Sequence, residues 1–188
     1  MDELFEYLNS IHSISATAKS ALREICFEIS ISRNESLQKI GQTCKTIYFV
    51  KKGVLRIYYY KDDIDITESF EFEHAVVARA ESLFSGKPSR KGIQALEDTE
   101  LIAIHSNALF ALYDTYPDLE RLFRKIFEQA YVKTIQRLES LQFHSAEERY
   151  QQLIEEQPNV IRRIPLKFIA SYLGITQVSL SRIRAGKK

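Results

Sequence analysis

IPLKFIASYLGITQVSLSRIR, residues 164–184, predicts two short helices joined by a tight turn. Pro165 suits the first position of a helix, because its missing N–H would be unpaired there anyway. Gly174 can leave that helix in the left-handed conformation that most other residues avoid. Thr176 can then cap a second helix with its hydroxyl oxygen. This order of signals predicts a helix-turn-helix.

The apolar residues of this segment fall on one side of each expected helix. Ile169 and Leu173 lie four residues apart, and Leu180 and Ile183 lie three apart, which are the spacings of a buried helix face. Ala170 is small, so the second helix can cross the first closely. The opposite side of the second helix is left for contacts outside the protein, and it carries Gln177, Val178, Ser181 and Arg182.

Those outward side chains suit the edges of DNA bases. In a helix-turn-helix, the N-terminal part of the second helix enters the major groove. There Gln177 can bond adenine, Arg182 can bond guanine, and Val178 can contact a thymine methyl group. Thr176 and Ser179 are expected to contact phosphates, helped by the helix N-terminus. The alternative is a helical hairpin that serves packing only.

Charge is divided unevenly along the 188 residues, although the net charge is only +1. Residues 159–188 hold seven basic residues and no Asp or Glu, whereas residues 1–158 hold 19 basic and 25 acidic residues. A basic end on an acidic body predicts contact with a polyanion, and nucleic acid is the expected one. A solvated basic tail is the alternative. We expect DNA backbone contacts from Arg162, Arg163, Arg184, Lys187 and Lys188.

Short strand-like segments fill residues 28–105. They are rich in β-branched and aromatic residues, and turn signals such as Gly86-Lys87-Pro88 separate them. Many short strands at such spacing predict an antiparallel barrel or jelly roll. Helical periodicity precedes these segments, through about Cys26. The expected strands are 29–31, 47–50, 54–60, 64–67 and 101–104.

Helical periodicity returns after His105. Ser106 can cap a segment that runs to Tyr116, and residues 118–143 form the longest periodic stretch of the chain. A helix of that length spans about 39 Å, longer than a small barrel needs for cover. Its surplus apolar length predicts pairing with a second copy of the chain. The alternative is a helix packed wholly on its own barrel.

A capping box follows the long stretch. Ser145 and Glu148 have the three-residue spacing at which each side chain satisfies the other's backbone N–H. The pattern predicts a helix that begins here and turns Tyr150 and Leu153 inward.

Composition limits the remaining classes. Hydrophobic residues make up 45% and charged residues 27% of the chain, as in ordinary globular proteins. No stretch reaches the roughly 18 apolar residues of a membrane span, and the N-terminus is acidic where a secretory signal would be basic. We therefore expect a cytoplasmic protein without membrane contact. Two cysteines, Cys26 and Cys44, form neither a disulfide framework nor a metal cluster.

No arrangement of residues predicts an enzyme. Metal sites of jelly-roll enzymes need closely spaced histidines with a carboxylate, whereas His12, His74, His105 and His144 are widely separated. A nucleophile elbow, a phosphate-cradling loop and a Cys/His pair are also missing. We expect no catalytic residue, no metal and no cofactor.

Further motifs match a known fold. Gly41 and residues 48–56, YFVKKGVLR, match the paired-glycine signature of cyclic-nucleotide-binding-like barrels. Residues 81–89 and 93–98 fall where that fold carries its phosphate-binding cassette. Together with residues 118–143 and the C-terminal motif, they make the chain similar to the Crp/Fnr family of transcription regulators, particularly the short forms common in Bacteroidetes-type bacteria.

The resemblance implies an α+β fold in three parts. Residues 1–117 would form an antiparallel β-barrel or jelly roll with N-terminal helices, residues 118–143 a dimerisation helix, and residues 144–188 a helix-turn-helix DNA-binding domain. It also implies a homodimer that binds double-stranded DNA at a near-palindromic operator. Many relatives add a β-hairpin wing, for which residues 157–165 leave room only for a short connection.

The expected effector pocket departs from the family pattern. Glu81 fits the position that holds the ribose hydroxyl in nucleotide-binding members, but Ser89 stands where an Arg pairs with the phosphate. A hydroxyl cannot replace a bidentate guanidinium, and Arg90, in a strand, would point elsewhere. We expect no cyclic nucleotide, but an unidentified small molecule or no effector at all, at a pocket of Glu81, Ser82, Ser89 and Arg90.

Two other sensing chemistries of the family are not expected. Two isolated cysteines cannot hold an iron–sulfur cluster. The one conceivable haem ligand, His74, is a lone histidine of the kind usually found at a surface or in a core. The alternative function is a ligand-binding or protein-interaction module whose terminal helices do not read DNA sequence.

Overall fold

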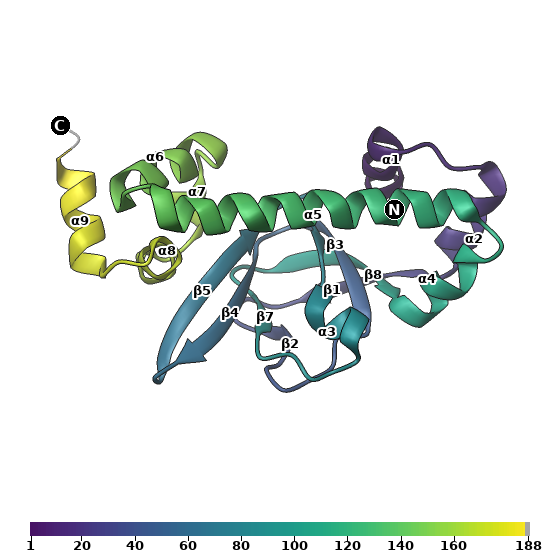
Figure 1. The fold of residues 1–188 in the computed structure, drawn as a ribbon, viewed down its shortest axis with the longest axis horizontal. Coiled ribbons are helices and arrows are strands. Elements are labelled where there is room, and N and C mark those ends of the chain that lie inside the picture. Colours follow the sequence, from purple (N-terminus) through teal and green to yellow (C-terminus); the bar gives the residue numbers. More distant parts are fainter. Residues whose placement is uncertain (187–188) are drawn as a thin grey trace.

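The structure is a computed structural model, and it describes residues 1–186. Two four-stranded antiparallel sheets form its centre (Figure 1). The strand order of the first sheet is β1 (Cys26–Ile31), β8 (Thr99–His105), β3 (Thr46–Lys52) and β6 (Val76–Val77). The order of the second is β2 (Ser36–Gln38), β7 (Gly92–Ala95), β4 (Leu55–Lys61) and β5 (Ile64–Glu71). The expected antiparallel barrel or jelly roll is thereby confirmed.

An apolar core joins the two sheets, and one glycine allows a close approach at its edge. The core takes side chains from both sheets: Val50, Leu55, Ile57, Val77, Ile93, Ala95 and Leu101. Between β3 and β4, a Cβ on Gly53 would lie 2.5 Å from the Thr99 hydroxyl oxygen and 2.8 Å from the Thr99 Cα, and the residue has a φ of +108°. Only glycine fits this turn.

Four elements of the barrel region escaped prediction from the sequence. They are β2, β6, β7 and a helix, α3 (Ala80–Ser85), and each has only two to six residues. Segments of that length show too few repeats of an apolar pattern to be recognised. Two of the four residues of the expected effector pocket, Glu81 and Ser82, nevertheless lie in α3, and the other two, Ser89 and Arg90, lie between α3 and β7.

Helices cover one end of the sheets (Figure 1). These are α1 (Asp2–Ile11), α2 (Ala16–Glu24), α4 (Ser106–Tyr113) and the first half of α5 (Pro117–Phe143). The Ser15 hydroxyl caps α2. Ser106 does not cap α4, because its hydroxyl donates to the Lys45 carbonyl instead. The helix expected to reach Tyr116 ends at Tyr113.

The two halves of α5 differ in burial. Leu119, Leu122, Phe123 and Ile126 are buried in the cluster that α1, α2 and α4 share with the barrel. The second half exposes large apolar side chains instead: Tyr131, Val132, Leu138, Leu141 and Phe143. The alternative of a helix packed wholly on its own barrel is therefore wrong.

Four helices form the other end of the molecule: α6 (Ala146–Glu156), α7 (Val160–Arg163), α8 (Leu166–Leu173) and α9 (Gln177–Ala185). The capping box of Ser145 and Glu148 is present with both of its hydrogen bonds. The one-turn helix α7 was not expected, and Pro165 precedes α8 as its N-cap rather than taking the first helical position. Between residues 106 and 186 the structure has no strand, so this part of the chain has no wing.

Candidate nucleic-acid interface

The turn between α8 and α9 has the expected geometry. Gly174 adopts a φ of 70° and a ψ of 30°, and the Ile175 N–H donates to the Ala170 carbonyl over 3.0 Å. The Thr176 hydroxyl then accepts the Ser179 N–H over 3.1 Å, which caps α9. Gly174 therefore fixes where α8 ends, and Thr176 fixes where α9 begins.

Two arginines bind the carboxyl end of α8. Arg137 on α5 donates to the Tyr172 carbonyl, and its guanidinium carbon lies 3.8 Å from the centre of the Tyr172 ring. Arg149 on α6 donates to the Leu173 carbonyl over 2.7 Å. Cations at a helix C-terminus satisfy carbonyls that have no partner within the helix. The turn is therefore connected to both α5 and α6.

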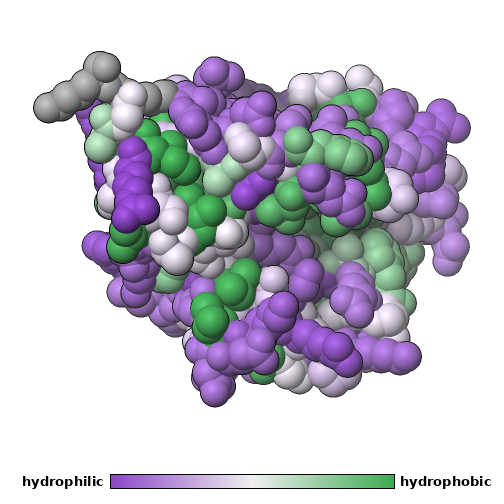
Figure 2. Space-filling view, turned by 60° about the vertical axis from the view of Figure 1, so that its left-hand side comes forward, coloured by the Kyte–Doolittle hydropathy of each residue, from purple (hydrophilic) through white to green (hydrophobic). Residues whose placement is uncertain are grey.

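The inner face of α9 is buried and its outer face is open. Leu180 is 1% exposed and belongs to a cluster with Ile169 and Leu173. The four expected base-contact residues are all exposed: Gln177, Val178, Ser181 and Arg182. We call these four residues the outer face of α9. Figure 2 shows hydrophobic patches between hydrophilic side chains at this end of the molecule.

The residues expected to contact phosphates differ in how exposed they are. Thr176 and Arg184 are exposed, and Ser179 is half-buried with its hydroxyl 3.0 Å from that of Thr176. Among residues 1–186, Arg162, Arg182 and Arg184 are exposed and form no ion pair. Lys187 and Lys188 lie outside the described residues.

Arg163 does not face outward, so the expectation that it contacts the DNA backbone is wrong. Its guanidinium donates to the Glu73 carboxylate over 2.9 and 2.5 Å and to Glu97 over 2.5 Å. Both carboxylates belong to the barrel, so Arg163 joins α7 to it rather than facing outward. The Arg163 guanidinium lowers the pKa of Glu73 to about 2.

The hydroxyls of the expected effector pocket are already bonded within the protein. The Ser82 hydroxyl donates to the Lys87 carbonyl over 2.5 Å and accepts the Cys44 N–H over 2.9 Å. The Ser89 hydroxyl donates to the Lys91 carbonyl over 2.9 Å and accepts the Lys91 N–H over 3.1 Å. Neither group is left to hold a phosphate.

The two charged residues of that pocket are exposed. Glu81 lies in α3, and Arg90 lies in a bend before β7, so the alternation expected for a strand does not apply to it. The sequence missed a half-buried cluster of charged residues nearby. The Glu68 carboxylate forms ion pairs with the Lys91 ammonium at 2.6 Å and with the Arg79 guanidinium at 3.9 Å. No spacing signal could reveal it, because the three residues come from separate segments.

The histidine and the cysteines considered as cofactor ligands lie apart from one another in residues 1–186. His74 is exposed at a turn with a φ of 68°. Cys26 and Cys44 are free thiols. No group of three or more His, Cys, Asp or Glu residues in this part of the chain is arranged so that it could hold a metal ion. Among the helices described, none has the length and apolar character needed to cross a membrane.

Comparisons with known proteins agree with this architecture. Residues 28–116 match the family model of the cyclic nucleotide-binding domain. FixK2 from Bradyrhizobium japonicum aligns with a TM-score of 0.75 at 19% identity, over 86% of this chain and 84% of that one. The global regulator CLP from Xanthomonas campestris aligns with a TM-score of 0.72 at 15% identity, over 92% and 91%. A search of curated protein sequences gave no match.

A third solved structure names the wider family. It is a Crp/Fnr-family protein from Eubacterium rectale, described as a transcriptional regulator, with a TM-score of 0.71 at 17% identity, over 90% of this chain and 82% of that one. Together these matches define the fold: residues 28–116 match the family model of the cyclic nucleotide-binding domain, and the chain has the fold of the solved Crp/Fnr regulators. The resemblance inferred from the sequence is confirmed.

Proposed function

We propose that this chain is a transcription regulator of the Crp/Fnr type that binds double-stranded DNA through α9. The observation that carries the proposal is the outer face of α9. Its four side chains are exposed beside Arg184, which forms no ion pair with any residue from 1 to 186, while Leu180 anchors the opposite side. Residues 159–188 contain no acidic residue that would repel phosphates.

A homodimer is the second part of the proposal. The second half of α5 leaves Tyr131 68% exposed and Phe143 75% exposed, which favours an apolar partner of the same length. A second α5 is the simplest partner, since a two-fold axis would bury both helices at once. It would also place the two α9 helices about 34 Å apart on successive major grooves. The operator would then be a near-palindrome.

The barrel, in this proposal, does not bind cyclic nucleotides. Ser82 and Ser89 use their hydroxyls internally, and Lys91 pairs with Glu68. The pocket of Glu81, Ser82, Ser89 and Arg90 would bind an unidentified effector or none. The division into residues 1–117, 118–143 and 144–188 belongs to the same proposal.

Selection of bound fragments from random and genomic DNA tests the DNA-binding function. We expect an enriched inverted repeat whose half-sites are one helical turn apart. The matched control is the double variant Gln177→Ala and Arg182→Ala, which changes only exposed residues and should lose the enrichment. No enriched repeat with the unaltered chain would favour the alternative, an interaction module that does not read sequence.

Sedimentation tests the dimer. The unaltered chain at micromolar concentration should have twice the mass of one chain. Leu138→Glu places a charge on the exposed side of α5 and should give a monomer with an intact barrel. Glu139→Gln, at an exposed neighbouring position, is the control. A monomeric unaltered chain would contradict the dimer.

A further inference from the structure

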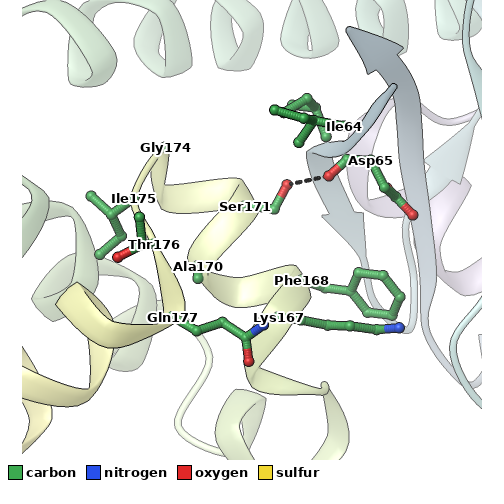
Figure 3. A pocket seen from close by; sticks show the side chains of 11 residues that line it. Ile64, Asp65, Lys167, Phe168, Ala170, Ser171, Gly174, Ile175, Thr176 and Gln177 are labelled. Atoms are coloured by element: carbon green, nitrogen blue, oxygen red, sulfur yellow. Dashed lines mark hydrogen bonds between the residues drawn. The ribbon is translucent and has the colours of Figure 1, made fainter. Parts of the chain in front are cut away.

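The β4–β5 hairpin reaches the helix-turn-helix. A cavity of about 600 Å³ opens between the two, and its lining includes Ile64 on the hairpin with Lys167 and Gln177 on α8 and α9 (Figure 3). Beside this cavity the hairpin and α8 meet through polar contacts. The sequence pattern gave no sign of them.

The first contact is centred on Arg56 of β4, which is only 3% exposed. Its two terminal nitrogens donate to the Asp65 carboxylate over 2.6 and 2.7 Å, and one of them also donates to the Thr67 hydroxyl over 3.2 Å. Its third nitrogen donates to the Gln94 side chain over 2.9 Å. These four bonds fix the plane of the guanidinium within the second sheet.

An α8 side chain lies on that fixed plane. The guanidinium carbon of Arg56 is 3.9 Å from the centre of the Phe168 ring and 4.5 Å from that of Tyr58. Phe168 is buried in a cluster that also contains Val54 and Leu96 of the barrel. A desolvated cation on an aromatic face is attractive, so Arg56 favours one position of α8 against the barrel.

The second contact completes the open edge of the sheet. β5 is the last strand of its sheet, so part of its backbone has no strand partner. Ser171 of α8 supplies one, because its hydroxyl accepts the Thr67 N–H over 2.8 Å. The same hydroxyl donates to the Asp65 carbonyl over 3.1 Å (Figure 3). One α8 hydroxyl thus bonds two backbone groups of the hairpin.

We propose that Arg56 and Ser171 are positioning residues that dock α8 on the β4–β5 hairpin and thereby set the direction in which α9 projects. The inference rests on the proposed function of α9 as the DNA-binding helix. In the docked arrangement the outer face of α9 is exposed, so docking leaves it free for DNA. A docked helix pair also has less conformational freedom to lose on binding.

Two variants and a control test the docking without DNA. Arg56→Lys keeps the charge but loses the planar, bidentate contacts. Ser171→Ala removes a single half-buried hydroxyl, so it serves if the buried substitution prevents folding. Ser10→Ala, which removes an exposed hydroxyl bond in α1, is the control. We expect backbone amides of α8 to exchange hydrogen about tenfold faster in both variants and at the normal rate in the control.

The same proteins then test the consequence for DNA binding, on the inverted repeat obtained by selection. Arg56→Lys and Ser171→Ala should weaken binding about tenfold. The dependence of affinity on salt should stay unchanged, because neither residue contacts phosphate. A changed salt slope, tighter binding, or normal exchange in α8 would overturn the positioning role. If the unaltered chain binds no DNA sequence, the proposed function fails, while the exchange experiment still decides whether α8 is docked.

Discussion

The outer face of α9 and the cassette of α3 and β7 both carry polar side chains, yet they differ in what those side chains already bind. On α9, Gln177 and Arg182 are exposed, and within residues 1–186 no ion pair holds the arginine. In the cassette, the Ser82 and Ser89 hydroxyls each donate to a carbonyl and accept an N–H of the same barrel. A polar group without a partner is available to a ligand, whereas a bonded one must first give up that bond.

The largest expected effect is a difference in stability between substitutions on the buried side and on the exposed side of α9. Leu180→Ala should destabilise the chain by about 2–5 kcal/mol, because it opens a cavity in a buried cluster. Val178→Ala, at a residue 62% exposed, should change stability by less than about 0.5 kcal/mol while weakening DNA binding. Thermal or urea unfolding measures both. Equal destabilisation would mean that the outer side of α9 is not open.

Arg182 tests whether the open side reads bases. Arg182→Ala should weaken binding to the selected repeat by about 1–3 kcal/mol and broaden sequence preference. Titrations of the repeat and of random DNA, at one salt concentration, measure the difference. An equal loss on both would make Arg182 a phosphate contact instead.

Sequence patterns predicted α9 better than they predicted the cassette, for a physical reason. Gly174, Thr176 and Leu180 lie within seven residues, and each acts on the helix end or face beside it. In the cassette, the partner of the Ser82 hydroxyl includes the Cys44 N–H, 38 residues away. A contact across that separation depends on how the sheets fold, so the sequence pattern could not predict which hydroxyls of the expected pocket are already hydrogen-bonded.

A pH experiment examines the junction between α7 and the barrel. Arg163 holds the pKa of Glu73 at about 2, below its value in an unfolded chain. This pair therefore stabilises the fold above about pH 4, and its contribution is lost as the pH falls from there towards 2. Because both side chains keep some solvent access, we expect about 1–2 kcal/mol.

Glu73→Gln should remove that pH dependence. Unfolding free energies of the unaltered chain and of Glu73→Gln, measured between pH 6 and 2, should differ most at pH 6 and converge at low pH. Glu120→Gln, at an exposed position on α5, is the control. A constant difference across this range would contradict the assigned pair.

The smallest expected effect is that of cyclic nucleotides on the Tm, through the cassette of α3 and β7. Cyclic AMP and cyclic GMP at millimolar concentration should not raise the Tm of the chain. A ligand present at a hundred times its Kd would add about 2.7 kcal/mol, which a thermal shift would reveal. A rise in Tm that Glu81→Ala abolishes would contradict this prediction and show that the barrel binds a cyclic nucleotide.

The sequence by itself determined the helix-turn-helix, the capping box at Ser145 and the apolar excess of the long helix. Each depends on residues within one or two helical turns, where backbone geometry fixes the neighbours. Only the tertiary structure decided that Arg163 faces Glu73 and that Arg56 lies under Phe168. These partners are far apart in the chain, and the folding of the barrel against the last four helices brings them together.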